Sequence, residues 1–408
     1  MARRGVSVLV ATVCLALAAP VASAAAVEPN DVVKESAGRR AEALEAVTTA
    51  GAVAAIAQVR DENGAWRAGT GVADLTTGAP VRTDGRFRAG SITKMFTSTT
   101  VLQLVGEGRV GLDDPIERYL PGTVPNGEHI TVRQLLNHSS GLWDPTNEKG
   151  GLFPDSTDPD AVRNWLDQGG MTRTITPAQV VAASVAHAPN FPPGEKFAYS
   201  NVNYTLLGML IERVTGRGYA QETTARILRP LGMNGTYFPG TATDIRGPHA
   251  HGYLTLVEGP GPQDRSDRDV TVASVSWANS AGELISTLDD LNRFEKALLG
   301  GRLLSEELMR EMRTTIPVEV NGQPTRLDYG LGLARLQLSC GPVYGHDGGV
   351  PGYSSQLWSS GGRQVAMSVT TRGGQAQQGA QLTAEGGVLE EAFCGNRQGA
   401  GNAQLKLG

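Results

Sequence analysis

The sequence lacks most of the features that mark membrane, nucleic-acid-binding or unfolded chains. Beyond the first residues, no apolar run reaches the roughly 20 residues that a helix needs to cross a bilayer. Basic residues are not in excess, because 36 Lys and Arg stand against 41 Asp and Glu, which argues against a nucleic-acid partner. With 40% hydrophobic and 19% charged residues, the composition is that of an ordinary globular protein.

The N-terminus carries the pattern of an export signal. Arg3 and Arg4 precede an apolar segment at 5–19, and small residues follow at Ala22 and Ala24. We therefore expect a signal peptide over 1–24, cleaved after Ala24 or just beyond it, and a secreted, extracellular protein without a membrane anchor. Loss of the two arginines makes the mature chain still more acidic.

Cysteine is scarce, with 3 residues in the whole sequence. Cys14 lies in the expected signal peptide, which leaves Cys340 and Cys394 as an even pair in an exported protein. We predict a disulfide between them, the alternative being two free buried thiols.

Strand patterns occupy both ends of the chain and helical patterns the middle. After an expected helix at 31–50, strands at 53–59 and 65–73 flank the hairpin signal Asn63-Gly64, and a helix follows residue 91. Helices are expected at 132–137, 177–186, 203–214 and 222–228, and a mobile polar segment at 259–268. Strands are expected at 330–338, 343–345, 354–359 and 364–370, and a closing helix at 375–393.

This arrangement predicts an α/β fold in one large domain over 30–396. An antiparallel sheet built from both chain ends would be flanked by helices, with a mostly helical inserted subdomain at 126–279. The Gly-rich residues 397–408 are expected to form a flexible tail.

The first chemical signal is the tetrapeptide Ser-Ile-Thr-Lys at 91–94, where a loop enters a helix. Positions i and i+3 share a helix face, so the Lys94 amine would lie beside the Ser91 hydroxyl. A serine needs such a base before it can act as a nucleophile. Taken alone, the pattern is also compatible with a helix-capping serine and a solvated lysine.

Two further signals follow in order. Tyr199-Ser200-Asn201 comes after a Pro-Pro-Gly turn, where a tyrosine beside an ammonium group could lower its pKa and shuttle protons. Gly345-His346-Asp347-Gly348-Gly349 lies beside an expected strand, and its glycines would let a substrate backbone approach the strand edge. Alone, each could be structural: a half-buried aromatic residue, or a Gly-rich hairpin with a surface histidine.

Together the three motifs resemble the serine β-lactamase and penicillin-binding superfamily. The Tyr-x-Asn motif points to the class C β-lactamase branch, and His-x-Gly resembles that of exported actinomycete D-alanyl-D-alanine carboxypeptidases. Segments at 130–142, 204–216, 280–287 and 329–333 are also similar to family segments, so the resemblance extends over nearly all of the mature chain.

The resemblance implies a role for each motif residue. Ser91 would be the acylated nucleophile, and Lys94 its base or the group that prepares Tyr199 for that task. Tyr199 would pass the proton to the leaving amine, and Asn201 would hold the substrate amide. His346 would stand in the place of the third-motif lysine and polarise Tyr199 or orient the substrate.

Substrate contacts are implied at the third motif and at an aromatic residue. The backbone N–H groups of Ser91 and Gly349 would form an oxyanion hole, with Gly348 beside it. Trp277, like Trp143, would line the cavity or belong to the core.

The third motif also departs from the family pattern. The carboxypeptidases carry threonines where this chain has Asp347 and Gly349. If Asp347 points into the cleft, it would repel a substrate carboxylate; the alternative is that it turns away along the strand and pairs with a basic residue.

Several functions remain open at this stage. The leading hypothesis is a monomeric, cofactor-free D-Ala-D-Ala carboxypeptidase-like enzyme that acts on cell-wall peptides. An esterase, a β-lactamase or a D-amino-acid peptidase would use the same machinery on a small peptide, ester or β-lactam. A non-catalytic peptide-binding relative is a further alternative, and the pair His249 and His251 is the only support for a metal hydrolase. No G-x-S-x-G elbow surrounds Ser91, which argues against an α/β-hydrolase.

Overall fold

An eight-stranded antiparallel sheet forms the centre of the protein. The computed structural model describes residues 29–62, 64–146, 150–155, 157–257, 265–320, 322–371 and 375–395. The strand order is β2-β1-β12-β11-β10-β9-β8-β7, so two strands from the start of the chain join six from its end. The strands are β1 (Ala54–Asp61), β2 (Gly64–Gly71), β7 (Ile316–Val320), β8 (Gln323–Tyr329), β9 (Ala334–Leu338), β10 (Gly341–Val350), β11 (Tyr353–Ser360) and β12 (Arg363–Thr370).

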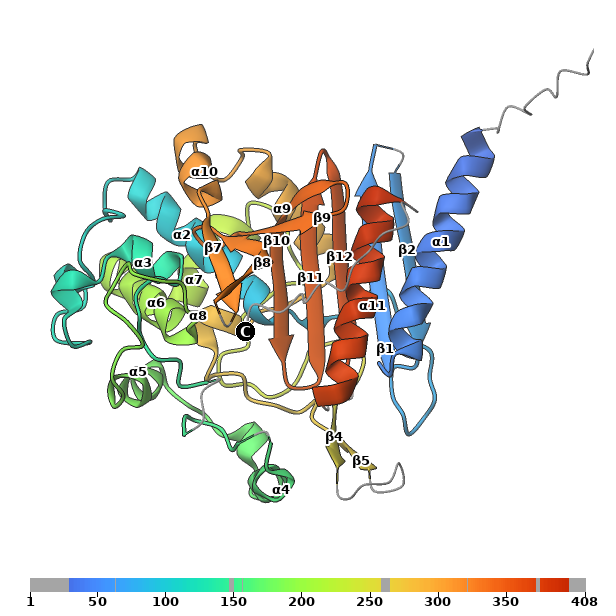
Figure 1. The fold of residues 1–408 in the computed structure, drawn as a ribbon, viewed down its shortest axis with the longest axis horizontal. Coiled ribbons are helices and arrows are strands. Elements are labelled where there is room, and N and C mark those ends of the chain that lie inside the picture. The colour runs from blue at the N-terminus through green and yellow to red at the C-terminus, as the bar shows by residue number, and fades with distance from the viewer. Residues whose placement is uncertain are drawn as a thin grey trace, which may run out of the picture.

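Two terminal helices cover one face of this sheet. Helices α1 (Pro29–Thr49) and α11 (Gln375–Cys394) lie side by side there (Figure 1). Strand β1 shows why: Ala55 and Ala57 pack with Leu44 of α1 and Val388 of α11 in one buried cluster. Alternate residues of a strand point to opposite faces, so the small apolar positions of β1 accept the two helices.

Helix α9 (Leu288–Leu299) lies on the opposite face, next to β1, β11 and β12. Gln58 of β1 points to this side, donates to Asp289 at 3.1 Å and accepts from Asn292 at 2.8 Å. The predicted fold class is confirmed: the sheet combines both chain ends and lies between helical layers.

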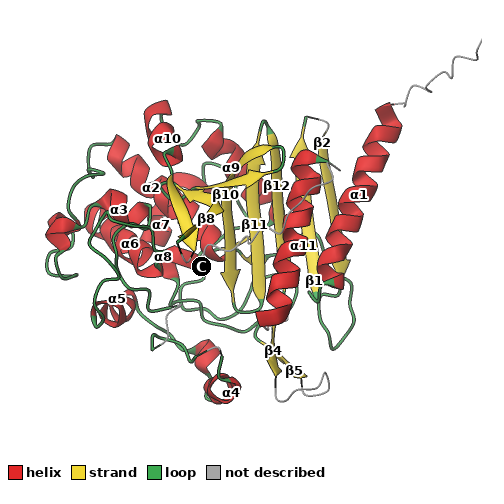
Figure 2. Cartoon of the chain, in the orientation of Figure 1, coloured by secondary structure: helices red, strands yellow, loops and turns green. Residues whose placement is uncertain are grey.

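Most of the remaining helices gather beyond the β7–β10 side of the sheet (Figure 2). The remaining helices are α2 (Thr93–Gly106), α3 (Val132–Leu136), α4 (Pro159–Asp167), α5 (Pro177–Val185), α6 (Asn201–Thr215), α7 (Tyr219–Thr223), α8 (Asn279–Gly282) and α10 (Glu306–Arg313). Helix α2 is buried on nearly all sides, and Lys94 is its single charged residue. The hydroxyls of Thr99 and Thr100 donate to the carbonyls of Met95 and Phe96, four residues back. Such local bonds let polar side chains sit inside a core helix.

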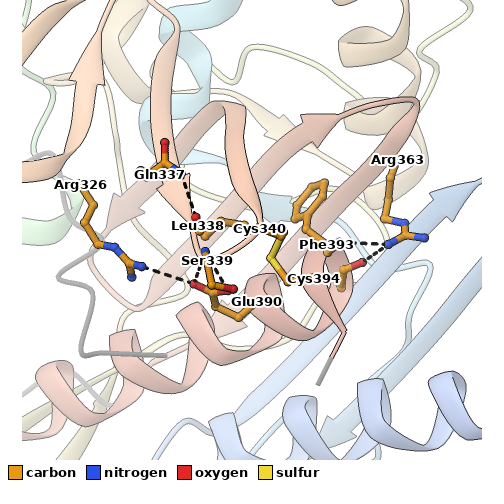
Figure 3. The surroundings of a disulfide bond; sticks show 10 residues. Arg326, Gln337, Leu338, Ser339, Cys340, Arg363, Glu390, Phe393 and Cys394 are labelled. Carbon is orange, nitrogen blue, oxygen red and sulfur yellow. Dashed lines mark hydrogen bonds and ion pairs between the residues drawn. A yellow bond between two sulfur atoms is a disulfide. The ribbon is translucent and has the colours of Figure 1, made fainter. Parts of the chain in front are cut away.

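The predicted disulfide between Cys340 and Cys394 is confirmed. Their Cα atoms lie 5.4 Å apart, and the bond joins the β9–β10 turn to the end of α11 (Figure 3). Beside it, the Ser339 hydroxyl donates to Glu390 of α11 at 2.6 Å.

Some expectations are wrong in detail. The segment 126–279, expected to be mostly helical, also contains a hairpin of β4 (Tyr253–Val257) and β5 (Arg265–Asp269), so residues 265–268 of the segment expected to be mobile form a strand. The strand expected at 330–338 starts only at Ala334, because Gly330 and Leu333 close a turn. The short strand expected at 343–345 is the ten-residue β10, whose glycines resemble a turn in sequence.

Helices α4, α9 and α10 were not expected, although Asp158, Thr287 and Ser305 cap their N-termini. The expected signal peptide at 1–24, the hairpin residue Asn63 and the tail at 397–408 lie outside the described residues. None of the helices that the structure describes is long and apolar enough to cross a membrane.

Candidate active site

Ser91 lies in a short 3-10 turn, η1 (Gly90–Ile92), that leads directly into α2. Hydrogen bonds of the residues on either side hold this turn. The Ala89 N–H donates to Leu284 O at 2.8 Å, and the Thr93 hydroxyl donates to Gly90 O at 2.7 Å. Gly90 has φ +53, and a Cβ there would be 2.6 Å from the backbone nitrogen of Gly349. Only glycine allows this approach, which brings the Ser91 turn against β10.

Lys94 joins Ser91 to two other elements of the site. Its Nζ donates to Ser91 Oγ at 3.0 Å, to Asn201 Oδ1 at 2.7 Å and to Ala281 O at 2.9 Å. The side chain is fully buried, and burial lowers the pKa of Lys94 from 10.5 to about 7, against the opposing fields of Asp144 and Asp347. A neutral amine is therefore populated near pH 7, as a general base requires.

Asn201, the first residue of α6, is bonded on every side within the protein. Its carbonyl accepts from Lys94, while its Nδ2 donates to Thr146 Oγ1 at 2.8 Å and to Asp144 Oδ2 at 3.2 Å. An amide has two N–H donors, and both are used here. Asn201 therefore orients Lys94, and holding a substrate amide would require one of these bonds to open.

Asp144 and Thr146 are buried residues that the sequence analysis missed. Asp144 Oδ1 accepts from the Thr146 hydroxyl at 2.9 Å and from the Thr146 N–H at 3.1 Å, which closes an Asx turn around Pro145. Burial raises the pKa of Asp144. The sequence Asp-Pro-Thr was a readable turn signal, but nothing in it pointed to the nucleophile.

Tyr199 lies just before α6, with its ring 4.7 Å from Lys94 Nζ. The pKa of its phenol is raised well above 10, because the packed surroundings disfavour the anion; a hydrogen bond with Ser91 opposes this only in part. The expectation of a lowered pKa is wrong, since burial is the largest influence on the phenol and raises its pKa. Tyr199 is a neutral phenol at pH 7 and can donate or relay a proton.

His138 is a third residue that the sequence analysis did not single out. Its ring stacks on Tyr199, with centroids 4.2 Å apart. Nδ1 lies 3.2 Å from the Ser200 N–H and 3.1 Å from Asn203 Nδ2, so this nitrogen accepts and Nε2 carries the proton. Burial lowers the pKa of His138 well below its usual value, which keeps the ring neutral.

His346 of β10 is completely buried and does not reach Tyr199 directly. Its Nε2 lies 2.8 Å from the Tyr329 hydroxyl, and its Nδ1 lies 2.5 Å from Asp347 O. Tyr329 in turn packs edge-on against the Tyr199 ring at 6.3 Å. His346 therefore contacts Tyr329, and it is not among the residues that line the cavity at Ser91.

Asp347 does not form part of the cavity wall either. It stands directly opposite Gln356 in the β10–β11 ladder, and the Gln356 amide donates to Glu385 of α11 at 2.9 Å. Directly opposite residues share a face, so Asp347 is directed toward α11, with its carboxylate 3.5 Å from His346 Nδ1. Asp347 therefore turns away from the cavity along the strand, as the alternative interpretation expected. The group beside its carboxylate is His346, whereas the basic residue Arg335 binds Asp328 at 2.8 Å.

The free edge of β10 completes the cavity. Strand β9 pairs with β10 only as far as Gly345, and no other described strand pairs with the later residues of β10 on that side. Gly348 packs closely, since a Cβ there would be 2.1 Å from Ala89 O. A cavity here is lined by Ser91, Tyr199, Asn201, Trp277, Ala278, Ala281, Gly282, Gly349 and Val350.

The other expected residues fall outside this cavity. Trp143 stacks on His187 at 3.8 Å and is not in the lining. His251 lies 2.6 Å from Asp269 of β5, and the described residues contain no group of three or more potential metal-binding side chains.

Comparisons with known proteins agree with this geometry. The family profile described as Beta-lactamase matches residues 22–387. Penicillin-binding protein 4* of Bacillus subtilis is 30% identical over 296 residues, 70% of this chain and 60% of that protein, so the match spans less than two thirds of the relative. Penicillin-binding protein 4 of Amycolatopsis lactamdurans is 29% identical over 75% of this chain and 77% of its own.

The matches with solved structures extend over a larger share of this chain. A D-stereospecific amidohydrolase from Streptomyces sp. superposes with a TM-score of 0.74 at 38% identity, covering 88% of this chain and 98% of its own. A D-amino acid amidase from Ochrobactrum anthropi, complexed with L-phenylalanine, also has a TM-score of 0.74, at 26% identity and with coverage of 87% and 97%.

Proposed function

Since the chain belongs to the beta-lactamase family of serine hydrolases and penicillin-binding proteins, we propose that it hydrolyses amides or esters of D-amino acids through an acyl-enzyme on Ser91. The observation that carries this proposal is the position of Lys94. One buried amine with a pKa of about 7 is hydrogen-bonded to Ser91 and held by Asn201 at the base of the cavity. This is the arrangement that an activated nucleophile needs.

In the first half of the reaction, Ser91 Oγ attacks the substrate carbonyl carbon and its proton passes to neutral Lys94. The N–H groups of Ser91 and Gly349 stabilise the oxyanion. Tyr199, a neutral phenol in contact with Ser91, relays the proton to the leaving nitrogen or oxygen, and the C–N or C–O bond breaks. The products are an ester on Ser91 and a free amine or alcohol.

In the second half, water takes the place of the leaving group. Lys94 or the Tyr199 relay accepts its proton, hydroxide adds to the ester carbonyl, and Ser91 leaves with a proton returned to Oγ. The net reaction adds one water across the amide or ester bond.

The D-amino amide assignment is supported by the cavity and by the relatives. None of the described residues that line the cavity carries a positive charge, and Lys94 is committed to internal bonds. A cation would be needed to hold a free substrate carboxylate in a partly desolvated site. The D-stereospecific amidohydrolase and the D-amino acid amidase among the structural neighbours point in the same direction.

D-Ala-D-Ala carboxypeptidase activity is the second candidate, because relatives of this chain are penicillin-binding proteins. Esterase and β-lactamase activity would use the same residues. We further infer that the protein is secreted as a monomer after removal of residues 1–24.

The test is a matched substrate panel with the purified protein. D-Ala amide, its L-enantiomer and a peptide ending in D-Ala-D-Ala are compared, the last as free acid and as C-terminal amide. We expect hydrolysis of the D-amide and a preference for the peptide amide over the acid. If the free-acid peptide is hydrolysed faster than its amide, the proposed amidase function is wrong and D-Ala-D-Ala carboxypeptidase activity takes its place.

The same protein, incubated with benzylpenicillin, should gain the mass of one adduct on Ser91, and Ser91→Ala should abolish both the adduct and turnover. If Ser91→Ala still hydrolyses substrate, the assignment of Ser91 as the nucleophile is wrong. A well-folded wild type that binds but never turns over any substrate would favour a non-catalytic peptide-binding relative. Asp347→Thr should leave the acid-to-amide ratio unchanged, because Asp347 faces α11.

A further inference from the structure

Asp144 is a buried carboxylate beside Asn201, although it is not among the residues that line the cavity at Ser91. Its side chain belongs to the loop after α3 and is only 2% exposed. Moving such a group from water into a protein interior is costly unless hydrogen bonds compensate. The contacts that Asp144 makes therefore indicate what it does at this position.

The loop that carries Asp144 is held by two neighbouring helices. The Ser140 hydroxyl donates to Asn203 Oδ1 of α6 at 2.6 Å. The Ser184 hydroxyl of α5 donates to Trp143 O at 2.6 Å, directly before Asp144. These bonds fix the position of Asp144 relative to the start of α6.

Asp144 is the acceptor in three hydrogen bonds. Oδ1 accepts from the N–H and the hydroxyl of Thr146, and Oδ2 accepts from Asn201 Nδ2 at 3.2 Å. Bonds donated to a carboxyl group favour its ionised form, because a protonated carboxyl must place a proton of its own. Burial raises the pKa of Asp144, and these bonds, together with the charge of Lys94, oppose the rise. Asp144 is therefore a carboxylate at neutral pH.

The ionised Asp144 determines how the Asn201 side chain is turned. A carboxylate only accepts hydrogen bonds, so the amide nitrogen of Asn201 must face Asp144. The carbonyl oxygen of Asn201 then faces the opposite side, where it accepts from Lys94 Nζ at 2.7 Å. Thr146 supports this orientation, since its hydroxyl accepts from Asn201 Nδ2 at 2.8 Å. Asp144 thus fixes the Lys94 amine through Asn201.

The aromatic groups packed around Lys94 are neutral at pH 7. The rings of Tyr199 and Tyr204 lie 4.7 and 5.4 Å from Nζ, and burial raises the pKa of both phenols. His138 stacks on Tyr199, and burial, followed by the charge of Lys94, lowers the pKa of its ring. Their protonation therefore does not set the charge around the amine near pH 7.

Two carboxylates act on the charge of Lys94. Burial lowers the pKa of Lys94 to about 7, and the charges of Asp144 and Asp347, in that order, oppose this shift. On β10, Asp347 faces α11 with His346 beside it, whereas Asp144 is joined to Lys94 through the Asn201 amide. Loss of the Asp144 charge would therefore make the ammonium form of Lys94 less stable.

We propose that Asp144 is a positioning residue for Lys94: its carboxylate turns the Asn201 carbonyl toward the amine, and its negative charge stabilises the ammonium form. The inference rests on the proposed function, in which Lys94 is the base of the acylation step. Because the charge of Asp144 counteracts burial, it raises the pH at which Lys94 becomes a base. Without this charge, the protein would reach full activity at lower pH, but with a less well oriented base.

The experiment measures kcat/KM for p-nitrophenyl acetate between pH 5 and 9, because this ester is uncharged throughout. The midpoint of the profile reports the protonation of the base in the free enzyme, and the plateau above it reports how well the base is oriented. In Asp144→Asn, the midpoint should fall by about one pH unit, since a nearby opposite charge is lost. The plateau should fall about tenfold, because the Asn201 amide is no longer held in one orientation.

Three further variants separate charge from orientation and from folding. Thr146→Val keeps the carboxylate but removes one acceptor of the Asn201 amide, so the plateau should fall about 3- to 10-fold while the midpoint stays within about 0.3 units. Asp144→Ser is a second neutral variant, with a smaller side chain that the fold accommodates more easily. Asp290→Asn is the matched control: this carboxylate of α9 is also buried and accepts from the Thr236 hydroxyl, and its loss should leave midpoint and plateau as in the wild type.

The outcomes distinguish the two proposals. If D-Ala amide is not hydrolysed but the ester midpoint moves as expected, the D-amidase function is wrong and the role of Asp144 stands. If only the amide is hydrolysed, the same comparison is made with it. If wild type hydrolyses neither compound, both proposals are wrong.

A midpoint that stays at the wild-type value in both neutral variants would overturn the inference even where the plateau falls, because disturbed packing lowers the plateau alone. A shifted midpoint with an unchanged plateau would contradict the orienting role of Asp144.

Discussion

The imidazole ring of His138 lies stacked against the phenol ring of Tyr199, with centroids 4.2 Å apart and planes at 30°. His138 is completely buried, and its Nε2 has no hydrogen-bond partner among the residues that the structure describes. It also has φ +60, a left-handed conformation that few residues other than glycine adopt. The ring thus supports Tyr199 although His138 has a buried N–H group without a described partner and a strained backbone conformation.

The first prediction concerns this stacking contact. His138→Asn keeps a residue type that tolerates the left-handed conformation but removes the ring beneath Tyr199. We expect kcat to fall about 10- to 100-fold while KM changes much less, because the proton relay loses its orientation. Asn126→Ala, at another left-handed position with an exposed side chain, is the control. A kcat within about twofold of wild type for His138→Asn would show that Tyr199 is positioned without it.

The second prediction concerns pH. The base must be neutral, and burial lowers the pKa of Lys94 to about 7. The reactive fraction therefore rises with pH up to about 7 and is nearly constant above it. We expect kcat/KM for an uncharged ester to increase about tenfold per unit below that point and then to level off.

Lys94→Arg is the matched variant, because a guanidinium stays charged throughout this range. It should lose at least about 1000-fold in kcat/KM and show no rise near pH 7. A wild-type profile that is flat from pH 5 to 9 would exclude Lys94 as the titrating base.

The third prediction concerns Glu283, whose pKa burial raises from 4.5 to about 7, with the backbone of Gly240 opposing the shift. Between these two values the folded protein retains a proton that the unfolded chain has released. Stability therefore falls as pH rises through this window. Glu283→Gln should reduce the loss of unfolding free energy between pH 5 and pH 8 by roughly 1–3 kcal/mol. Denaturant titrations at both pH values measure it, with the exposed Glu128→Gln as control; equal losses in both variants would contradict the prediction.

The fourth prediction concerns the disulfide, which spans 54 residues. Replacing both cysteines by serine should lower the free energy of unfolding by about 2–4 kcal/mol while kcat/KM stays near wild type, because neither cysteine lines the cavity. Ser339→Ala removes only the neighbouring bond to Glu390 and should cost much less. If the double serine variant loses activity at temperatures well below its unfolding transition, the disulfide also determines the geometry of the active site, and the prediction is wrong.

Local sequence patterns predicted the parts of this fold that depend on near neighbours. The helical spacing placed Lys94 beside Ser91, and the two atoms lie 3.0 Å apart. Strand patterns at both ends of the chain, with helical patterns between them, predicted a sheet made from both chain ends. The β10 strand was underestimated because its glycines, needed for close contact with the Ser91 turn, have the composition of a loop.

The electrostatics of the site could not be read from spacing. The pKa of Tyr199 depends on how completely the fold surrounds its ring, and burial reverses the expected direction. The direction of Asp347 depends on its register opposite Gln356, which one strand alone does not determine. Asn201 was recognised, but the bonds that occupy both of its donors come from Asp144 and Thr146, more than fifty residues away.

The joining of both chain ends in one sheet has a consequence for the order in which this protein can fold. Ala54 of β1 and Thr370 of β12 are adjacent in the ladder although 316 residues separate them. One edge of the β1–β2 hairpin therefore stays unpaired during synthesis until the residues of β12 have emerged from the ribosome. Contacts across such a long stretch of chain make folding slow, so the late arrival of β12 is the step at which premature aggregation would compete with formation of the native sheet.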